Sequence, residues 1–367
     1  MDFIVEKTKV LAIEGSAYMR LEFKKIFESD PSILFSFAKG IEEGFSKLKE
    51  YKPDVITFDL NLSGVNTISI VKTILSEHKA PLIVVSMLTM EGAMHTFEAL
   101  ELGAFDCITK PMGALTILTK NVGKEILEKV KVAGRSGHMS SLRKNLSYTT
   151  QTSLPKTPPK KTIQIYNDDN PYKKKVTKAV AIGISTGGPK VLMDIIPALP
   201  KNLGAAIFLV QHIPAHFTKS FSVRLNSFSP LNVKEAESGE LVEEDTIYVG
   251  KGGYQLCLKR GYDGNTYINL TDEKFNFFKP SVTVMMESVL QIYGKKTVGV
   301  LMTGMGDDGA DAMVKIRKAG GITIAESQET AIVFGMPKEA IQRGGAEIVV
   351  PSYKIIEEIV KAVKRIL

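Results

Sequence analysis

The chain has few cysteines, few histidines and no long hydrophobic run. Its two cysteines, Cys107 and Cys257, have neither CxxC spacing nor a histidine cluster nearby. We therefore expect no disulfide framework or structural zinc site, and both cysteines are expected in the core. No segment approaches the roughly 20 apolar residues that a bilayer crossing needs, and Met1 to Val10 carries charge where a signal peptide would be hydrophobic. We expect a cytoplasmic protein without membrane insertion.

The net charge of +7 comes from one segment of the chain. Eleven lysines and arginines lie between Lys131 and Lys178, against two acidic residues, Asp168 and Asp169. This segment is rich in Ser, Thr and Pro and has no apolar periodicity, which predicts a flexible basic linker over residues 131–177. A cationic tether that contacts RNA or anionic lipid is the alternative. We favour the linker and expect no nucleic-acid partner.

The length of 367 residues, with 44% hydrophobic content, is typical of a soluble chain of two domains, and we place them at residues 1–130 and 178–367. The first alternates strand-like and helix-like patterns. The predicted strands are Lys9 to Ile13, Ile33 to Ala38, Val55 to Asp59, Leu82 to Ser86 and Phe105 to Thr109. The predicted helices are Ala17 to Glu28, Ile41 to Tyr51, Asn66 to Glu77, Glu91 to Leu102 and Leu115 to Lys131. Such a (βα)5 pattern predicts a flavodoxin-like doubly wound parallel sheet, with ligands beyond the carboxyl ends of its strands.

Three residues fall at those strand ends: Asp59, Ser86 and Lys110. With this spacing, residues 1 to about 130 resemble a response-regulator receiver domain. The resemblance implies that Asp59 accepts a phosphoryl group from a histidine kinase, that Ser86 hydrogen-bonds it and that Lys110 neutralises it. Independently, a carboxylate that attacks a phosphoryl group needs its charge offset, usually by Mg²⁺ and a fixed cation. The plain alternative is that these are solvated residues at strand ends.

The region where the metal should bind departs from the receiver pattern. The usual acidic pair after the first strand is replaced by Glu14-Gly15, and the stretch after Asp59 reads Ser63-Gly64-Val65-Asn66-Thr67. One carboxylate is lost, so Glu14 and Asp59 would have to hold Mg²⁺. Mg²⁺ binding and phosphorylation of Asp59 are therefore hypotheses.

The second domain carries three motifs, each after an apolar strand-like run. Ser185 follows Lys178 to Ile184, His212 follows Ala206 to Gln211, and Asp308 lies in the glycine-rich loop after Thr297 to Met302. A serine hydroxyl is a poor nucleophile unless an imidazole takes its proton and an acid orients that imidazole. The sequence predicts that these side chains meet at one edge of a doubly wound, mostly parallel sheet of an α/β hydrolase-type domain.

Alternatives exist for each position. His216, one helical turn after His212, is a second candidate base, and Asp307 competes with Asp308 for the acid or caps a helix. No histidine follows residue 216, which disfavours an ordinary α/β-hydrolase, where the histidine comes last. A dinucleotide site is disfavoured because Ser185 replaces the second glycine of GxGxxG. A metal site at the adjacent Asp307 and Asp308 is disfavoured, because no other histidine or acidic residue has the spacing of a companion ligand.

Several motifs in one order resemble the CheB family of chemotaxis response-regulator protein-glutamate methylesterases. They are Ile182-Gly183-Ile184-Ser185-Thr186-Gly187-Gly188, Gln211-His212-Ile213-Pro214, Phe217-Thr218-Lys219-Ser220-Phe221, Lys279-Pro280-Ser281-Val282, Leu301 to Gly309 and Phe334-Gly335-Met336-Pro337. The resemblance implies Ser185 as nucleophile, His212 as base and Asp308 as orienting acid. It also places Thr186 and Met305 in the oxyanion and active-site loops. Asp307 stands where the family commonly has Asn.

The resemblance further implies the reaction and its partners. The expected activity is hydrolysis of γ-glutamyl methyl esters on methyl-accepting chemoreceptors, with deamidation of receptor glutamines as a related reaction. Catalysis needs no cofactor, and a chemotaxis histidine kinase is the expected phosphodonor. In the family the unphosphorylated receiver covers the catalytic cleft. Two other readings stay open: a non-catalytic signalling module with a degenerate receiver, and a serine hydrolase with another ester substrate.

Overall fold

The computed structural model describes residues 7–62, 65–87, 89–110, 120–143, 175–272 and 278–366. The chain divides into two compact units, Met1–Thr152 and Ser153–Leu367. We call them the receiver unit and the catalytic unit and describe each by itself. Most of the basic segment predicted as a linker, residues 144–174, lies outside the described residues.

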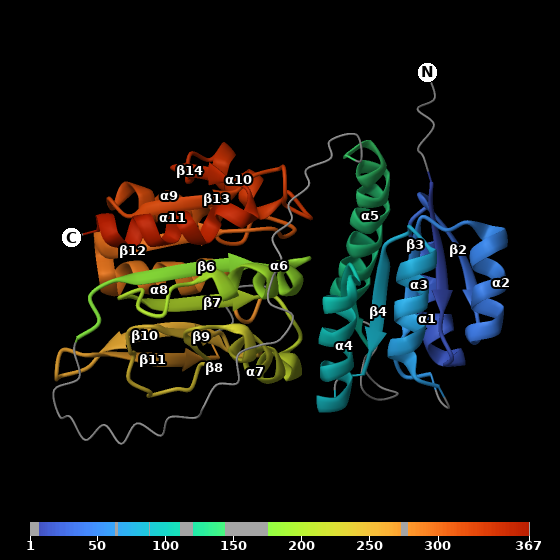
Figure 1. Ribbon diagram of the computed structural model, residues 1–367, viewed down its shortest axis with the longest axis horizontal. Helices are drawn as coiled ribbons and strands as arrows, with labels where there is room; N and C mark the ends of the chain where they lie inside the picture. The colour runs from blue at the N-terminus through green and yellow to red at the C-terminus, as the bar shows by residue number, and fades with distance from the viewer. Residues whose placement is uncertain are drawn as a thin grey trace. The chain divides into compact units, whose positions relative to one another are not determined.

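The receiver unit is a five-stranded parallel sheet in the order β2-β1-β3-β4-β5, with helices between the strands (Figure 1). Its strands are β1 (Thr8–Ile13), β2 (Ile33–Ala38), β3 (Val55–Asp59), β4 (Leu82–Ser86) and β5 (Asp106–Thr109). Its helices are α1 (Ala17–Glu28), α2 (Ile41–Tyr51), α3 (Thr67–Glu77), α4 (Met90–Leu102) and α5 (Lys120–Arg143). The order is that of the flavodoxin-like fold, so the predicted fold class of this half is confirmed.

Local sequence signals explain where these elements begin and end. Ser16, Asn66 and Thr89 each cap a helix, because their side-chain oxygens accept a hydrogen bond from the backbone N–H three residues later. Helix α4 ends at Gly103, which has a positive φ of 116°. Every residue of β3 and β4 is buried, as expected for central strands covered on both faces.

The last helix of this unit differs from the prediction. We expected it over Leu115 to Lys131, but α5 is Lys120–Arg143, so it continues past the boundary placed at residue 130. Residues 111–119 lie outside the described part of the chain. The domain boundaries themselves stay predictions.

The catalytic unit is built on a seven-stranded parallel sheet in the order β14-β13-β12-β6-β7-β9-β8. These strands are β6 (Ala179–Ile184), β7 (Ala206–Gln211), β8 (Asn232–Glu235), β9 (Thr246–Val249), β12 (Thr297–Leu301), β13 (Ile322–Glu326) and β14 (Ile348–Val350). A separate antiparallel hairpin pairs β10 (Gln255–Arg260) with β11 (Thr266–Thr271). The predicted doubly wound, mostly parallel α/β domain is confirmed.

Helices cover both faces of this sheet (Figure 1). They are α6 (Gly188–Ile195), α7 (Thr218–Phe228), α8 (Val282–Tyr293), α9 (Ala310–Lys318), α10 (Met336–Gln342) and α11 (Ser352–Arg365). Helices α8, α9 and α10 pack in series, and α6 contacts both α7 and α11. Central strands β6, β7 and β12 are buried throughout, so their carboxyl ends are fixed by the core.

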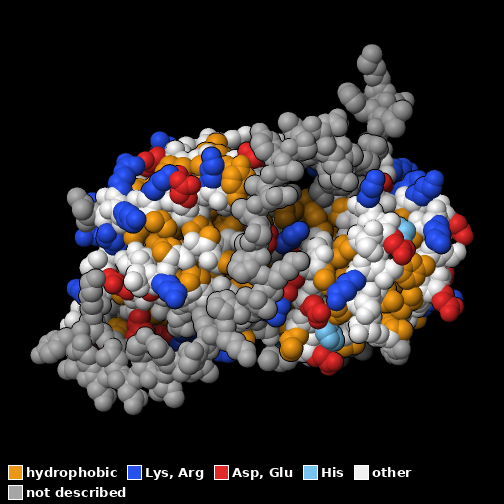
Figure 2. Space-filling view, in the orientation of Figure 1, with side chains coloured by type: hydrophobic (Ala, Val, Ile, Leu, Met, Phe, Trp, Pro, Cys, Tyr) orange, Lys and Arg blue, Asp and Glu red, His pale blue; other side chains and the backbone are white. Residues whose placement is uncertain are grey.

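The face drawn in Figure 2 has charged side chains of both signs. On the face drawn in Figure 2, Lys and Arg side chains alternate with Asp and Glu side chains over the coloured residues. Exposed ion pairs occur among the described residues, such as Lys361 with Glu357 at 2.6 Å. Within the described ranges, no helix combines the length and apolar character that would let it span a membrane.

Candidate active site

Ser185 lies one residue beyond β6, in a sharp turn toward α6. Its backbone N–H donates to the Thr303 carbonyl at 2.9 Å, and its carbonyl accepts from Gly188 N at 2.8 Å. Gly187 has a positive φ of 75°, a conformation that glycine adopts without strain. Gly304 packs directly on the serine, because a Cβ at this glycine would lie 2.7 Å from Ser185 Cβ. The loop after the neighbouring strand β12 therefore fixes the position of Ser185.

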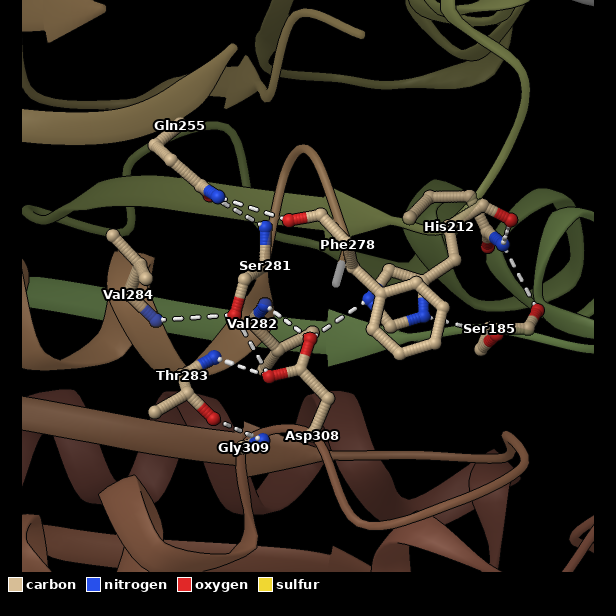
Figure 3. Close-up of polar contacts among 11 residues, drawn as sticks. Ser185, His212, Gln255, Phe278, Ser281, Val282, Thr283, Val284, Asp308 and Gly309 are labelled. Atoms are coloured by element: carbon tan, nitrogen blue, oxygen red, sulfur yellow. Dashed lines mark hydrogen bonds and ion pairs between the residues drawn. The ribbon is translucent and has the colours of Figure 1, made fainter. Parts of the chain in front are cut away.

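His212 follows β7, the strand next to β6, and its backbone N–H donates to the Ile184 carbonyl at 3.2 Å. Its Nδ1 lies 3.2 Å from Ser185 Oγ and its Nε2 lies 2.9 Å from Asp308 Oδ2 (Figure 3). A carboxylate accepts hydrogen bonds, so the proton of the neutral ring is on Nε2 and the lone pair of Nδ1 faces the hydroxyl. The two ring nitrogens exchange the roles that they have in the chymotrypsin triad, where Nε2 faces the serine.

Asp308 is held by four donors. Oδ1 accepts from Ser281 Oγ and Thr283 N, each at 2.9 Å, and Oδ2 accepts from Val282 N at 2.7 Å and from His212. Two of these donors are the first N–H groups of α8, where the helix dipole favours a negative charge. Burial raises the pKa of Asp308, but hydrogen bonds from His212 and Thr283 and the positive charge of the imidazole when it is protonated outweigh the effect of burial and lower the pKa well below its usual range. Asp308 therefore stays ionised.

The alternatives for base and acid lie elsewhere. His216 is exposed in the short 3-10 helix Ala215–Phe217. The Asp307 carboxylate pairs with Arg343, its Oδ2 lying 2.6 Å from Nη2, and Asp311 and Glu339 contact the same guanidinium. The extra charge of Asp307 is thus balanced by an arginine.

Sequence reasoning missed the role of Gln211. Its side-chain Nε2 donates to the carbonyl of Ser185 at 2.9 Å and to that of His212 at 3.2 Å, so one buried amide ties the two motifs together. Its Oε1 would lie 2.1 Å from a Cβ at Gly188, which explains the second glycine of that motif. The sequence shows that Gln211 directly precedes His212, but it does not show which groups the Gln211 side chain contacts.

Thr186 and Met305 flank the serine from two loops. Thr186 is buried, and its carbonyl accepts from Thr303 Oγ1 at 3.0 Å. Met305 follows Gly304, the residue in close contact with Ser185. Among the described residues, the backbone N–H groups of Thr186 and Met305 have no protein acceptor. Such N–H groups beside a nucleophile are what an oxyanion requires.

The receiver unit also has a buried charged cluster, at the carboxyl edge of its own sheet. Lys110 Nζ lies 2.7 Å from Asp59 Oδ2 and 2.9 Å from Glu14 Oε1, and all three residues are buried. Burial, followed by the charge of Asp59, raises the pKa of Glu14 to about 7. Ser86 does not join this cluster, since its hydroxyl donates to the Gly92 carbonyl at 3.0 Å.

The predicted metal ligands can be compared with what Mg²⁺ requires. Glu14 Oε2 is buried and has no hydrogen-bond partner in the described part of the chain, while Asp59 Oδ1 accepts from Asn61 N at 2.8 Å. Mg²⁺ commonly binds one or two protein carboxylates and completes its coordination shell with water. Glu14 and Asp59 are two neighbouring carboxylates, and Glu14 Oε2 has no partner in the described part of the chain, so they meet this requirement. Within the described residues, no cluster of three or more His, Cys, Asp or Glu residues could hold a metal ion.

Two protein families match different halves of the chain. The CheB methylesterase family matches residues 180–359, and the response regulator receiver domain family matches residues 10–122. A protein-glutamate methylesterase/protein-glutamine glutaminase of Syntrophomonas wolfei is 47% identical over 97% of this chain and 99% of its own length. A relative with the same description from Carboxydothermus hydrogenoformans is 43% identical over 98% of this chain and 100% of its own.

Two crystal structures resemble the separate halves. The CheB methylesterase catalytic domain of Thermotoga maritima is 46% identical, covering 50% of this chain and 97% of that structure, with a TM-score of 0.49. The response regulator domain of Thermotoga maritima CheB is 41% identical, covering 35% of this chain and 97% of that structure, with a TM-score of 0.32.

The parallel sheet with a serine, a histidine and an aspartate in one hydrogen-bonded line has the architecture of a serine hydrolase, and it is joined here to a receiver unit. The relatives that match nearly the full length of the chain identify the family of this hydrolase. The chain belongs to the CheB family of response-regulator methylesterases.

Proposed function

We infer that this chain hydrolyses γ-glutamyl methyl esters of methyl-accepting chemoreceptors, releases methanol, and deamidates receptor glutamines as a related activity. The chain is a carboxylic-ester hydrolase of the CheB family. The observation that carries the mechanism is the line from Ser185 Oγ through the His212 ring to Asp308, with distances of 3.2 and 2.9 Å. We expect the protein to act in the cytoplasm, on the cytoplasmic part of its receptors.

In the first step Ser185 Oγ attacks the ester carbonyl while His212 Nδ1 takes the hydroxyl proton. The ring becomes an imidazolium, which the ionised Asp308 stabilises through Nε2. Because Asp308 is already held by three other donors, little reorganisation is needed when the positive charge forms.

The remaining steps use the same groups. The N–H groups of Thr186 and Met305 are the proposed donors to the tetrahedral oxyanion. Nδ1 then protonates the leaving methoxide, and methanol departs from the acyl-enzyme. Water attacks the acyl carbonyl with Nδ1 as general base, which frees the glutamate and restores Ser185. A glutamine substrate follows the same path with ammonia as the leaving group.

The receiver half is proposed to regulate this reaction. Asp59 is the proposed phosphoacceptor for a chemotaxis histidine kinase, and Lys110, 2.7 Å away, would offset the added negative charge. Ser86 would have to turn away from Gly92 to bond the phosphoryl group. Glu14 and Asp59 would hold Mg²⁺, which supplies charge neutralisation at the phosphoryl oxygens.

The test is methanol release from receptor membranes that carry labelled methyl esters. The wild-type chain should release methanol, and Ser185→Ala should not. A wild-type chain that cleaves small esters but leaves methylated receptor untouched would favour another ester substrate. Equal signalling output from wild type and Ser185→Ala in cells would favour the non-catalytic module.

A further inference from the structure

An aromatic side chain that none of the proposed steps uses lies against the catalytic imidazole. The ring of Phe278 stacks on the ring of His212, with centroids 4.2 Å apart and planes inclined by 9° (Figure 3). Phe278 is 38% exposed, so its ring lies at the surface of the unit and not in the core. Such a nearly parallel contact limits how far the imidazole can tilt out of the line between its two hydrogen-bond partners.

The backbone of Phe278 is anchored by a buried glutamine. Gln255, at the start of β10, donates from Nε2 to the Phe278 carbonyl at 2.9 Å and accepts from Ser281 N at 2.8 Å through Oε1. Gly253 N adds a bond to the Lys279 carbonyl at 3.1 Å. The β10 strand and the turn before it thus fix the segment that carries the aromatic ring.

The same short segment also holds the catalytic acid. From Ser281 to Thr283 it supplies three of the four donors to Asp308. One stretch of chain, residues 278–283, therefore restrains His212 twice: through the acid bound to Nε2 and through the ring stacked on its face.

We propose that Phe278 is a positioning residue for His212, which keeps Nδ1 aimed at Ser185 Oγ and places an aromatic face against the ring when it becomes an imidazolium. This inference rests on the proposed function, since it concerns the same base. A cationic ring over an aromatic face is attracted by the ring quadrupole, so the stack is stronger in the transition state than in the resting enzyme. Loss of the stack should lower the rate of every step that passes through Nδ1.

The experiment compares Phe278→Leu, which keeps apolar volume but removes the aromatic face, with Phe278→Tyr, which keeps the ring. Tyr254→Leu is the matched control, because Tyr254 is similarly exposed, at 40%, and lies in the loop just before Gln255. All are made in the full chain. Two reactions are followed: methanol release from methylated receptor, and phosphonylation of Ser185 by a small fluorophosphonate. In the second, an Oγ–P bond forms, the P–F bond breaks, fluoride leaves and the proton goes to His212 Nδ1.

We expect Phe278→Leu to lower both kcat for methanol release and the phosphonylation rate by a similar factor, roughly 3- to 10-fold, with KM changed less than about twofold. Phe278→Tyr should restore both rates, and Tyr254→Leu should leave both unchanged. In proton NMR spectra, the ring protons of His212 should move downfield in Phe278→Leu, because they lose the shielding of the stacked ring.

Three outcomes would overturn the proposal. Unchanged phosphonylation with a raised KM would make Phe278 a receptor contact. Failure of Phe278→Tyr to restore the rates would mean that the aromatic face is not what matters, and unmoved His212 resonances would mean that no stack exists in solution. The fluorophosphonate and NMR readouts do not depend on the receptor, so they distinguish a failure of this inference from a failure of the proposed substrate.

Discussion

Each unit has carboxylates beyond or at the carboxyl ends of its parallel strands, but these carboxylates have different hydrogen-bond partners in the two units. Asp308 in the catalytic unit accepts four hydrogen bonds, and its pKa is lowered. Glu14 in the receiver unit shares one lysine with Asp59, has a buried oxygen without a partner in the described part of the chain, and has a raised pKa. All four donors to Asp308 are present in the folded chain, whereas the receiver cluster holds two carboxylates against one lysine.

The two sites therefore differ in how much they must change to act. A preorganised acid is required at every turnover, because reorganisation would be repeated in each transition state. A receiver must respond to a signal. Its charged cluster can do so if binding of a cation or a phosphoryl group changes the balance of charge and with it the favoured conformation. Substitutions at these residues test whether the two sites differ in this way.

Ser185→Ala should have the largest effect, a loss of about 10³-fold or more in kcat/KM for methanol release, because no other group replaces the nucleophile. The midpoint of thermal unfolding should stay unchanged, since the hydroxyl bonds His212 and not the backbone. Substantial residual turnover would contradict the triad.

Asp308→Asn should lower kcat/KM by about 10²- to 10⁴-fold. The new amide can present its NH₂ group to Nε2, which moves the ring proton to Nδ1 and removes the acceptor for the serine proton. Steady-state kinetics measure the loss, and a matching loss in Asp307→Asn would contradict the assignment, because Asp307 is paired with Arg343.

Asp308 should also make stability depend on pH in a defined direction. Its folded pKa is lowered, so its contribution to stability is fully present above the unfolded pKa of about 3.9 and is lost as pH falls toward the folded value. The free energy of unfolding of wild type relative to Asp308→Asn should therefore be constant near neutral pH and shrink in acid. Urea unfolding between neutral and strongly acidic pH measures this, and a difference that grows in acid would refute it.

Lys110→Met should destabilise the receiver unit by about 3 kcal/mol, because it leaves two buried carboxylates without their cation. Mg²⁺ should restore part of this loss, and it should raise the unfolding midpoint of the variant more than that of wild type. Lys24→Met is the control, since Lys24 forms an exposed pair with Glu28 and should cost less than about 1 kcal/mol. Equal responses of variant and wild type to Mg²⁺ would argue against a metal at Glu14 and Asp59.

Glu326→Gln should have the smallest effect, a stabilisation on the order of 1 kcal/mol at pH 8. Glu326 is fully buried, accepts from Thr303 N and Thr330 Oγ1, and burial raises its pKa. Because the folded pKa of Glu326 is raised, the contribution of this residue to stability is fully present below its unfolded pKa and is lost as pH rises through its folded pKa. The gain from Gln should therefore disappear near pH 4 in chemical unfolding. A gain that is the same at both pH values would show that ionisation is not its cause.

The sequence predicted the strand ends well, and with them much of the site. Ser185, His212 and Asp59 directly follow or end apolar runs, and parallel strands bring such ends together regardless of detail. The choice between Asp307 and Asp308 needed the family resemblance, because both follow the same strand. The stack of Phe278 and the bond from Gln211 to Ser185 could not be predicted, since both depend on side-chain directions.

The loop after β12 sets different limits on Gly304 and Gly306, the first two of its three glycines. A Cβ at Gly304 would collide with Ser185 and with Met336, whereas a Cβ at Gly306 would meet nothing within 4 Å, although its φ of 75° favours glycine or asparagine. Efforts to engineer acceptance of bulkier esters should therefore leave the first glycine untouched. Variation should begin at the second, with asparagine as the first replacement to try.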